Sequence, residues 1–165
     1  MPDTHELARG KFLSLKMRNG WEYVERTNAT SIVALIAVTE QDELILVEQY
    51  RPPVGASVIE LPAGLVGDVD GDDSIEAAGR RELKEETGYE ADRVECLFNG
   101  PISAGLSTEI LTVLKAEGLR LVGDGGGVDG EDIRVHRVPV SELKAWLLTQ
   151  SVMVDPKVFA ALAFL

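Results

Sequence analysis

Residues 81–89 read Arg-Glu-Leu-Lys-Glu-Glu-Thr-Gly-Tyr and place three carboxylates within five positions of a helical pattern. Helical residues are about 100° apart, so Glu85 and Glu86 lie roughly 60° and 40° to either side of Glu82, and the three like charges share one face. Carboxylate oxygens are hard ligands that suit Mg²⁺ or Mn²⁺, and a bound cation would offset their repulsion. The stretch therefore indicates a metal site, although a carboxylate pair on its own is more often a solvated helix face.

A glycine-containing segment precedes this helix. Residues 60–67 read Glu-Leu-Pro-Ala-Gly-Leu-Val-Gly, and an acidic run follows up to Asp73. Together these stretches resemble the Nudix box, which reads Gly, five residues, Glu, seven residues, Arg-Glu-hydrophobic-any-Glu-Glu-any-Gly-hydrophobic. The second half matches at every specified position, whereas Asp73 replaces the box glutamate, and eight rather than five residues separate it from Gly64. Either the loop carries an insertion of three residues, which the Leu-Pro-Ala-Gly string favours, or Gly67 takes the place of the box glycine.

Three further stretches resemble the ADP-ribose pyrophosphatase branch of the Nudix family. They are Gly-Trp-Glu-Tyr-Val-Glu-Arg at 20–26, Val-Glu-Gln-Tyr-Arg-Pro-Pro-Val at 47–54 and Gly-Glu-Asp-Ile-Arg-Val-His at 130–136. The resemblance implies an enzyme that hydrolyses the pyrophosphate bond of a nucleoside diphosphate-sugar and releases a nucleoside monophosphate and a sugar phosphate. It makes ADP-ribose the first substrate to expect. One departure is Ala104, which stands where this branch typically has a proline, so other nucleotide sugars stay open.

Two other functions fit part of the pattern. A MutT-like relative would act on nucleoside triphosphates, but the stretch at 47–54 and the extended N-terminal hairpin argue against that activity. A non-catalytic Nudix module that senses a nucleotide sugar would be expected to have lost metal carboxylates, whereas this chain keeps all three. The intact motif therefore favours an enzyme.

The resemblance also implies roles for residues of the motif. Glu82 and Glu86 match the metal-ligand positions of the family, Glu85 would bridge or support a second ion, and the carbonyl of Ala63 would complete the shell. Arg81 would orient a carboxylate through its planar guanidinium group. The expected cofactor is Mg²⁺, with Mn²⁺ as the alternative.

Three acidic residues are candidates for the general base that activates water. Matching through the stretch at 130–136 places Asp129 at the position that often has this role in the branch. Glu131 is a second candidate because a glutamate reaches further than an aspartate, and Glu85 is the third.

Substrate contacts are expected outside the motif. Trp21 and Tyr23 lie in the stretch that resembles the base-stacking segment of relatives, which sometimes acts across a dimer, although Trp21 would equally suit packing on a sheet. Arg51 could bind phosphate in a bidentate manner, and its alternative is a surface charge. Glu109 falls where relatives place a substrate or metal contact.

Composition limits the other possibilities. The 165 residues suit one domain, and the net charge of −12 disfavours nucleic acid, whose binding requires Lys and Arg. The longest apolar runs are far below the roughly 20 residues that span a bilayer, and the N-terminus lacks a signal-peptide pattern. Cys96 is the single cysteine and lies in an apolar alternation, which predicts a buried thiol in a protein of the reducing cytoplasm.

The order of predicted elements gives an α+β fold, and the resemblance implies the Nudix architecture, a mixed sheet between helices with an N-terminal antiparallel hairpin. Asn19-Gly20 marks the hairpin turn, and residues 1–30 are a candidate dimerisation element. Residues 119–130 are rich in glycine and predict a mobile loop, either a connector or a lid. Strands are predicted at 11–17, 21–26, 31–39, 43–49, 58–61, 93–99, 108–115 and 133–138, and helices from 73 or 74 to 88, at 141–148 and at 155–162.

Overall fold

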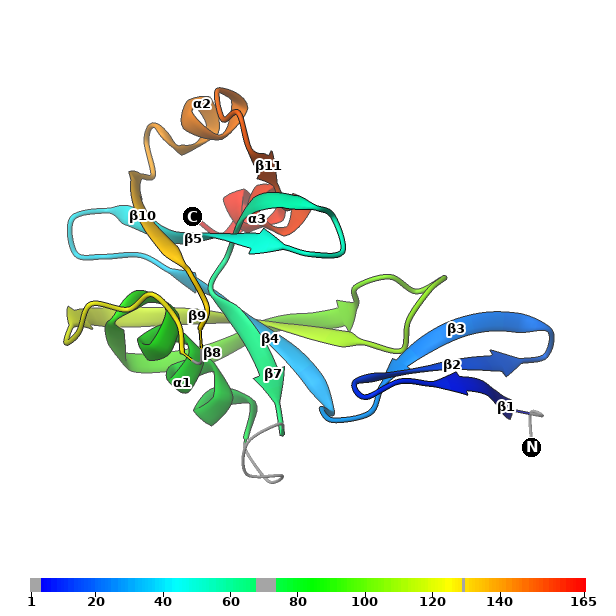
Figure 1. Cartoon of the computed structure of the whole chain (residues 1–165). Helices are drawn as coiled ribbons and strands as arrows, with labels where there is room; N and C mark the ends of the chain where they lie inside the picture. The colour runs from blue at the N-terminus through cyan, green and yellow to red at the C-terminus, as the bar shows by residue number, and fades with distance from the viewer. Residues whose placement is uncertain (1–3, 68–73, 129) are drawn as a thin grey trace.

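The strands form three sheets in the computed structural model, which describes residues 4–67, 74–128 and 130–165 (Figure 1). The N-terminal sheet is antiparallel, with β1 at Thr4–Arg9, β2 at Leu13–Arg18 and β3 at Trp21–Arg26. The second sheet has the order β10–β5–β6–β11, with strands at Arg134–Pro139, Glu43–Arg51, Ala56–Glu60 and Met153–Val154. The third has the order β7–β4–β9–β8, with strands at Ala63–Val66, Ser31–Ala37, Ile110–Leu121 and Tyr89–Pro101.

The acidic motif forms the helix α1 (Ile75–Thr87), as the sequence predicts. The side-chain oxygen of Ser74 caps its start by accepting a hydrogen bond from the N–H of Ala77 at 3.1 Å. Gly88 ends it with φ at +75°, a left-handed conformation that glycine adopts without strain. The other predicted start, Asp73, lies outside the described residues. The remaining helices are short: α2 at Leu143–Leu148, α3 at Pro156–Ala161 and the 3₁₀ turn η1 at Leu162–Phe164.

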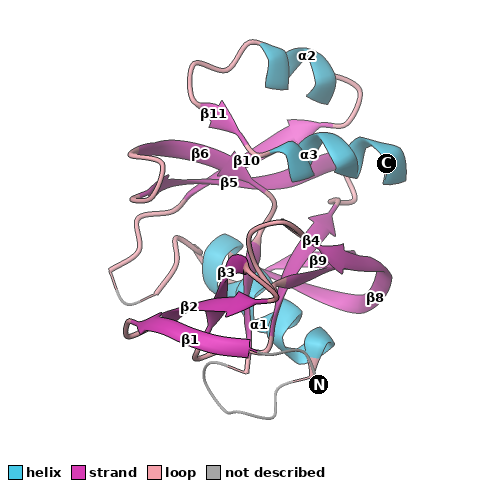
Figure 2. Cartoon of the chain, turned by 90° about the vertical axis from the view of Figure 1, so that its right-hand side faces the viewer, coloured by secondary structure: helices cyan, strands magenta, loops and turns pink. Residues whose placement is uncertain are grey.

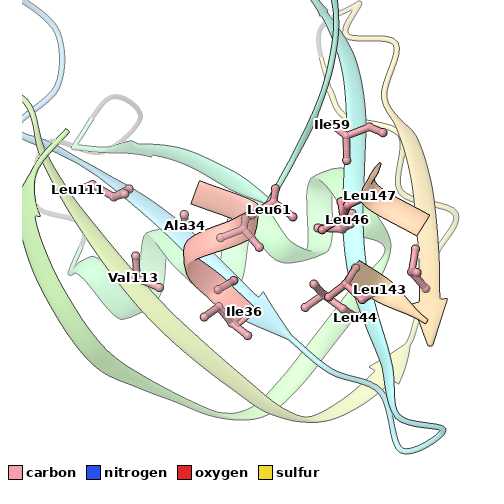
Figure 3. Close-up of a cluster of buried hydrophobic side chains, with 13 residues drawn as sticks. Ala34, Ile36, Leu44, Leu46, Ile59, Leu61, Leu111, Val113, Leu143 and Leu147 are labelled. Carbon is pink, nitrogen blue, oxygen red and sulfur yellow. The ribbon is translucent and has the colours of Figure 1, made fainter. Parts of the chain in front are cut away.

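Strand β4 is buried on both faces and separates two hydrophobic cores. Its side chains alternate, so Ala34 and Ile36 belong to one core and Val33 and Leu35 to the other. The first core joins both four-stranded sheets to α2 and α3, and Figure 3 shows ten of its side chains with labels. The second core packs α1 against the third sheet through Ala78, Leu83 and Leu114. The shared strand thus places the acidic helix and both sheets in one packed unit.

Both four-stranded sheets are mixed. Strand β4 pairs in parallel with β9, and β6 pairs in parallel with β11, whereas the other neighbouring pairs are antiparallel. Helix α1 lies on one side of the strands, and α2 and α3 lie on the other (Figure 1 and Figure 2). This confirms the expected α+β arrangement of mixed strands between helices, with the strands divided between two sheets. In the part of the chain that the structure describes, no helix has the length and apolar character that a bilayer span requires.

The N-terminal sheet extends away from the rest of the chain (Figure 1). Asn19 and Gly20 have φ of +53° and +80° and form the predicted turn between β2 and β3. The sheet joins the body through β3, where the N–H of Val24 donates to the carbonyl of Leu106 at 2.8 Å. Strand β1, which the sequence pattern did not predict, is exposed along its whole length. Several large apolar side chains of this N-terminal region are also exposed: Leu7, Phe12, Leu13 and Trp21.

The prediction of a buried thiol at Cys96 is wrong, because the side chain is exposed. Val94 packs against the core around α1, whereas Leu97 packs against the other core. A register shift between Cys96 and Phe98 in the pairing of β8 with β9 breaks the simple alternation on which the prediction rested.

Candidate active site

A cleft of about 410 Å³ brings the acidic helix together with strands of both four-stranded sheets. Of the three motif glutamates, Glu82 and Glu86 line it and Glu85 does not. Glu131, a candidate base, lines the same cleft, as do Ala63 and Arg51 from the predicted site. The remaining lining residues are Arg26, Ile32, Gln49, Glu60, Gly64, Leu65, Ile102 and Lys157.

Gly64 makes room for the carboxylate of Glu82. A Cβ atom added to Gly64 would lie 1.9 Å from Cδ of Glu82 and 2.1 Å from its Oε1. No side chain can occupy that space while Glu82 keeps its position, since van der Waals contact between carbon atoms begins near 3.5 Å. This close approach supports Gly64 as the counterpart of the box glycine and thus a loop lengthened by three residues.

Glu86 is the most buried carboxylate of the motif, with only 4% of the residue exposed. Its Oε2 accepts a hydrogen bond from the N–H of Ala63 at 3.0 Å. Burial raises the pKa of Glu86 from its ordinary value of 4.5 to about 8, and the negative charges of Glu82 and Glu131 act in the same direction. The hydrogen bond from Ala63 and the charge of Arg51 partly oppose this shift. Such a carboxylate requires a proton or a cation beside it.

Arg81 ties two motif glutamates to strand β7. Its Nη1 lies 2.8 Å from Oε1 of Glu82 and 3.3 Å from Oε2 of Glu85, and its Nη2 donates to the carbonyl of Leu65 at 3.2 Å. The planar guanidinium group therefore holds carboxylates on one side and backbone on the other. Glu85 is directed to this arginine and away from the cleft lining.

The carboxylates fit a hard divalent cation that keeps part of its water shell. Within the described ranges, no three acidic, histidine or cysteine side chains converge on one point to form a complete metal cage. Glu82 and Glu86 nevertheless line one cleft next to the backbone of Ala63, and Mg²⁺ in particular uses one or two carboxylates together with waters and substrate phosphates. The raised pKa of Glu86 is consistent with this use, because burial without a cation disfavours its charged form.

Three cationic side chains line the cleft, and each is paired with a carboxylate. Nε of Arg51 lies 2.6 Å from Oε2 of Glu60, and Nε of Arg26 lies 2.8 Å from Oε1 of Glu109. The ammonium group of Lys157 pairs with Asp155, two residues earlier in the chain. Sequence reasoning found Arg51 through its motif but missed Arg26, Gln49, Glu60 and Lys157. Gln49 lies two residues before Arg51 on β5, so both side chains point to the same face of the sheet, and this spacing could have identified Gln49. No comparable pattern distinguishes Arg26 or Lys157.

The predicted aromatic contacts lie in a separate hollow of the same chain. Trp21 and Tyr23 line a volume of about 440 Å³ together with Arg18 and the loop at 104–108. The indole N–H of Trp21 donates to the carbonyl of Gly105 at 3.0 Å, and the guanidinium carbon of Arg18 lies 5.3 Å from the ring centre of Tyr23. Neither aromatic side chain lines the cleft that contains Glu86.

Glu109 lies between these two regions. It lines a third hollow of about 300 Å³, which shares Arg26 and Ile32 with the glutamate cleft and Thr108 with the aromatic hollow. Its carboxylate binds Arg26 rather than the motif residues.

The loop predicted at 119–130 begins later than expected. Residues 119–121 continue strand β9, and the following glycine-rich segment forms backbone hydrogen bonds with the end of α1. The N–H groups of Gly126 and Gly127 donate to the carbonyls of Glu86 and Glu85 at 2.9 and 3.0 Å. The docked segment leads to Glu131 at the cleft, while Asp129 lies outside the described residues.

Sequence comparison finds several proteins that are similar to this chain. The chain is similar to a methanol dehydrogenase activator of Bacillus methanolicus, with 39% identity over 61% of this chain and 52% of that protein. It is 35% identical to an ADP-sugar pyrophosphatase of Mus musculus over 85% of this chain and 71% of the relative. It is 34% identical to an ADP-ribose pyrophosphatase of Bacillus subtilis over 81% of this chain and 70% of the relative. The match thus spans only about half the length of the first of these relatives.

Comparison with solved structures shows the fold, and comparison with family models shows the family. A crystal structure of an ADP compounds hydrolase superposes with a TM-score of 0.78 at 21% identity, over 98% of this chain and 88% of that one, which shows a shared fold. The family model of the Nudix domain matches residues 28–162, which include the acidic helix and the whole glutamate cleft except Arg26. The resemblance read from the motif is therefore confirmed, and this chain belongs to the Nudix family.

Proposed function

We propose that this chain hydrolyses the pyrophosphate bond of a nucleoside diphosphate-sugar, with ADP-ribose as the first substrate. The observation that carries the proposal is the cleft in which Glu82 and Glu86 face three cationic side chains. Carboxylates able to hold metal and cations able to bind phosphate are the two parts that cleavage of a diphosphate requires. The names of the relatives, ADP-sugar pyrophosphatase and ADP-ribose pyrophosphatase, support the substrate class.

In this proposal Glu82, Glu86 and the carbonyl of Ala63 hold a divalent cation, Mg²⁺ or alternatively Mn²⁺. When bound, such an ion neutralises phosphate charge and lowers the pKa of water. Arg81 is a positioning residue, because its Nη1 holds Oε1 of Glu82 at 2.8 Å while Arg81 itself does not line the cleft. Glu85 supports the site through its contact with Arg81.

Glu131 is the proposed general base, since it is the candidate that lines the cleft. It accepts a proton from water as the water oxygen bonds to one phosphorus atom, and the bond from that phosphorus to the bridging oxygen breaks. The bridging oxygen leaves with the other phosphate group. Glu85 is less suited to this role because its carboxylate binds Arg81, and Asp129 stays a prediction from sequence.

Phosphate recognition is assigned to Arg51, Arg26 and Lys157, which reach the cleft from three different elements. When substrate binds, each of these side chains forms a hydrogen bond to a phosphate oxygen and weakens its ion pair with the neighbouring carboxylate. Glu109 contributes by holding Arg26 at 2.8 Å. Of the three, Arg51 acts on the acidic cluster through its charge, which lowers the pKa of Glu86 against the larger effect of burial.

A homodimer formed through the N-terminal sheet is part of the proposal. Leu7, Phe12 and Leu13 are exposed in this region, and burying them would remove apolar surface from water. Trp21 is 65% exposed, so in a dimer it would contact the base of a nucleotide bound in the partner's cleft. Tyr23 lines the same hollow but is buried, with 8% of the residue exposed, and is therefore less suited to the base contact expected from the sequence.

The acidic composition supports a small-molecule substrate rather than a nucleic acid, because the net charge is −12. A single cysteine suits the reducing cytoplasm as the proposed location, since no internal disulfide can form.

The test is a panel of nucleotide sugars and nucleoside triphosphates incubated with Mg²⁺ or with a chelator, followed by separation of the products. Release of AMP and ribose phosphate from ADP-ribose, only with metal, supports the proposal. Release of pyrophosphate from triphosphates alone would instead identify a triphosphate pyrophosphohydrolase. Binding of nucleotide sugars without turnover would identify a sensing module.

A further inference from the structure

Three consecutive glycines, Gly125–Gly127, bind the C-terminal end of the acidic helix, and we refer to them as the glycine strap. The last carbonyls of an α-helix have no partner within the helix. Here the N–H of Gly126 donates to the carbonyl of Glu86 at 2.9 Å, and the N–H of Gly127 donates to the carbonyl of Glu85 at 3.0 Å. The strap therefore attaches to the backbone of the same residues whose side chains form the acidic motif.

The attachment leaves no space for a side chain at Gly125. A Cβ atom there would lie 2.5 Å from the carbonyl carbon of Thr87 and 2.7 Å from the carbonyl oxygen of Glu86. These are backbone atoms inside the helix, so they cannot rotate aside. The three strap residues also have φ between +67° and +100°, a region that other residues rarely adopt.

The strap also contacts Glu131 directly. A Cβ atom on Gly127 would lie 2.6 Å from Oε2 of Glu131 and 2.7 Å from its Cβ. The same Oε2 accepts a hydrogen bond from the N–H of Val128 at 3.1 Å. On the far side of Glu131, the N–H of the buried Ile133 donates to the carbonyl of Gly126 at 3.2 Å. Along the chain, Glu131 is thus flanked on both sides by residues that are anchored at the strap, although its side chain remains exposed.

We infer that the glycine strap is a positioning element that sets the carboxylate of Glu131 relative to Glu82 and Glu86. The inference rests on the proposed function, because it takes Glu131 as the base. One helix then supplies the metal carboxylates from its side chains and the anchor for the base from its final carbonyls. Small displacements of a reacting group lower rates steeply, so a shared anchor has a direct effect on turnover.

The competing explanation is that the strap only caps the helix. In that case its disruption would lower the stability of the fold, and the effect on turnover would be independent of Glu131. The two explanations differ in how a strap variant combines with a change at Glu131, which a double-mutant cycle measures.

The test uses Gly125→Ala, with Gly123→Ala as the matched control in the same segment. A Cβ atom on Gly123 meets no atom within 4 Å, so the control should keep the wild-type kcat. Gly125→Ala should lower kcat for ADP-ribose by about 100-fold, the lower end of the effect of losing a general base, with KM little changed. The double variant Gly125→Ala with Glu131→Gln should be no slower than Glu131→Gln alone.

Two further measurements keep the test decisive. Gly127→Ala acts on the side chain of Glu131 rather than on the helix backbone, so it should show the same dependence on Glu131 even where Gly125→Ala folds poorly. Hydrogen exchange should show the amides of Gly126 and Gly127 protected in the wild type and in Gly123→Ala, and unprotected in Gly125→Ala.

The inference would be overturned if the reductions in kcat multiply when Gly125→Ala and Gly127→Ala are each combined with Glu131→Gln. It would also be overturned if Gly125→Ala and Gly127→Ala both keep the wild-type kcat. A wild-type protein that hydrolyses no nucleotide sugar would instead refute the proposed function. Fast exchange of the Gly126 and Gly127 amides in the wild type would overturn the docked strap in either case.

Discussion

Replacing Gly64 by alanine is expected to move the carboxylate of Glu82 out of its position in the cleft. The added Cβ would lie 1.9 Å from Cδ of Glu82, and ordinary van der Waals contact begins at 3.4 Å, so the carboxylate carbon must move by about 1.5 Å. A misplacement of about 1 Å can reduce a rate about 100-fold, which corresponds to about 2.7 kcal/mol of transition-state stabilisation. The displaced group is the end of a flexible side chain, so the thermal stability of the variant should stay close to that of the wild type.

The assay is a titration of Mg²⁺ at saturating ADP-ribose, with Gly100→Ala as the control because its Cβ meets no atom within 4 Å. Gly64→Ala should require more Mg²⁺ for half-maximal rate and should reach a lower kcat, since one of the proposed carboxylate ligands is out of place. Wild-type kcat and wild-type Mg²⁺ dependence in Gly64→Ala would refute the assignment of Glu82 as a ligand held against Gly64.

Three other substitutions test the burial of Glu86, phosphate binding by Lys157 and the dimer. Because the folded-state pKa of Glu86 is raised from 4.5 to about 8, the metal-free folded protein binds more protons than the unfolded chain in this range, and its stability should fall as the pH rises from 4.5 to 8. Glu86→Gln should flatten this dependence of Tm on pH in the presence of a chelator, and an equal slope in both proteins would contradict the shift. Lys157→Ala should raise KM for ADP-ribose about tenfold with kcat unchanged, because one charge-assisted hydrogen bond of about 1.4 kcal/mol is lost. Lys144 is exposed and lies outside the cleft, so Lys144→Ala should leave KM unchanged. Phe12→Glu should convert a homodimer to a monomer, because it places a charge on the exposed apolar surface of the N-terminal region. Light scattering measures the mass, and a single-chain mass for the wild type would disprove the proposed dimer.

Local patterns were enough to predict the acidic helix. Ser74 and Gly88 mark its ends through hydrogen bonding and backbone conformation, properties that a residue type carries with it. The turn at Asn19 and Gly20 was predictable for the same reason. Local signals of this kind depend on a few neighbouring residues and need no knowledge of the rest of the chain.

Contacts between distant segments were not predictable in this way. Lys157 reaches the cleft from α3 and Arg26 from β3, and neither position has a motif that distinguishes it from a surface charge. The exposure of Cys96 depends on a register shift between two long strands, which the alternation of apolar residues does not encode.

The glycine-rich segment shows the same limit. Its composition indicates a flexible loop, because glycine has the greatest backbone freedom in the unfolded chain. In the folded chain this freedom lets Gly125 lie against the backbone of Thr87, a contact that only the three-dimensional arrangement reveals.

The metal-holding role of Glu82 and Glu86 is tested by the rate of AMP release from ADP-ribose by the wild type and by Glu86→Gln, each with Mg²⁺ and with a chelator. We expect rapid release by the wild type with Mg²⁺ only, and a reduction of several orders of magnitude in a Glu86→Gln protein that remains folded. Equal rates in the two proteins, or release by the wild type in the absence of metal, would contradict the claim that Glu82 and Glu86 hold a catalytic metal in this cleft.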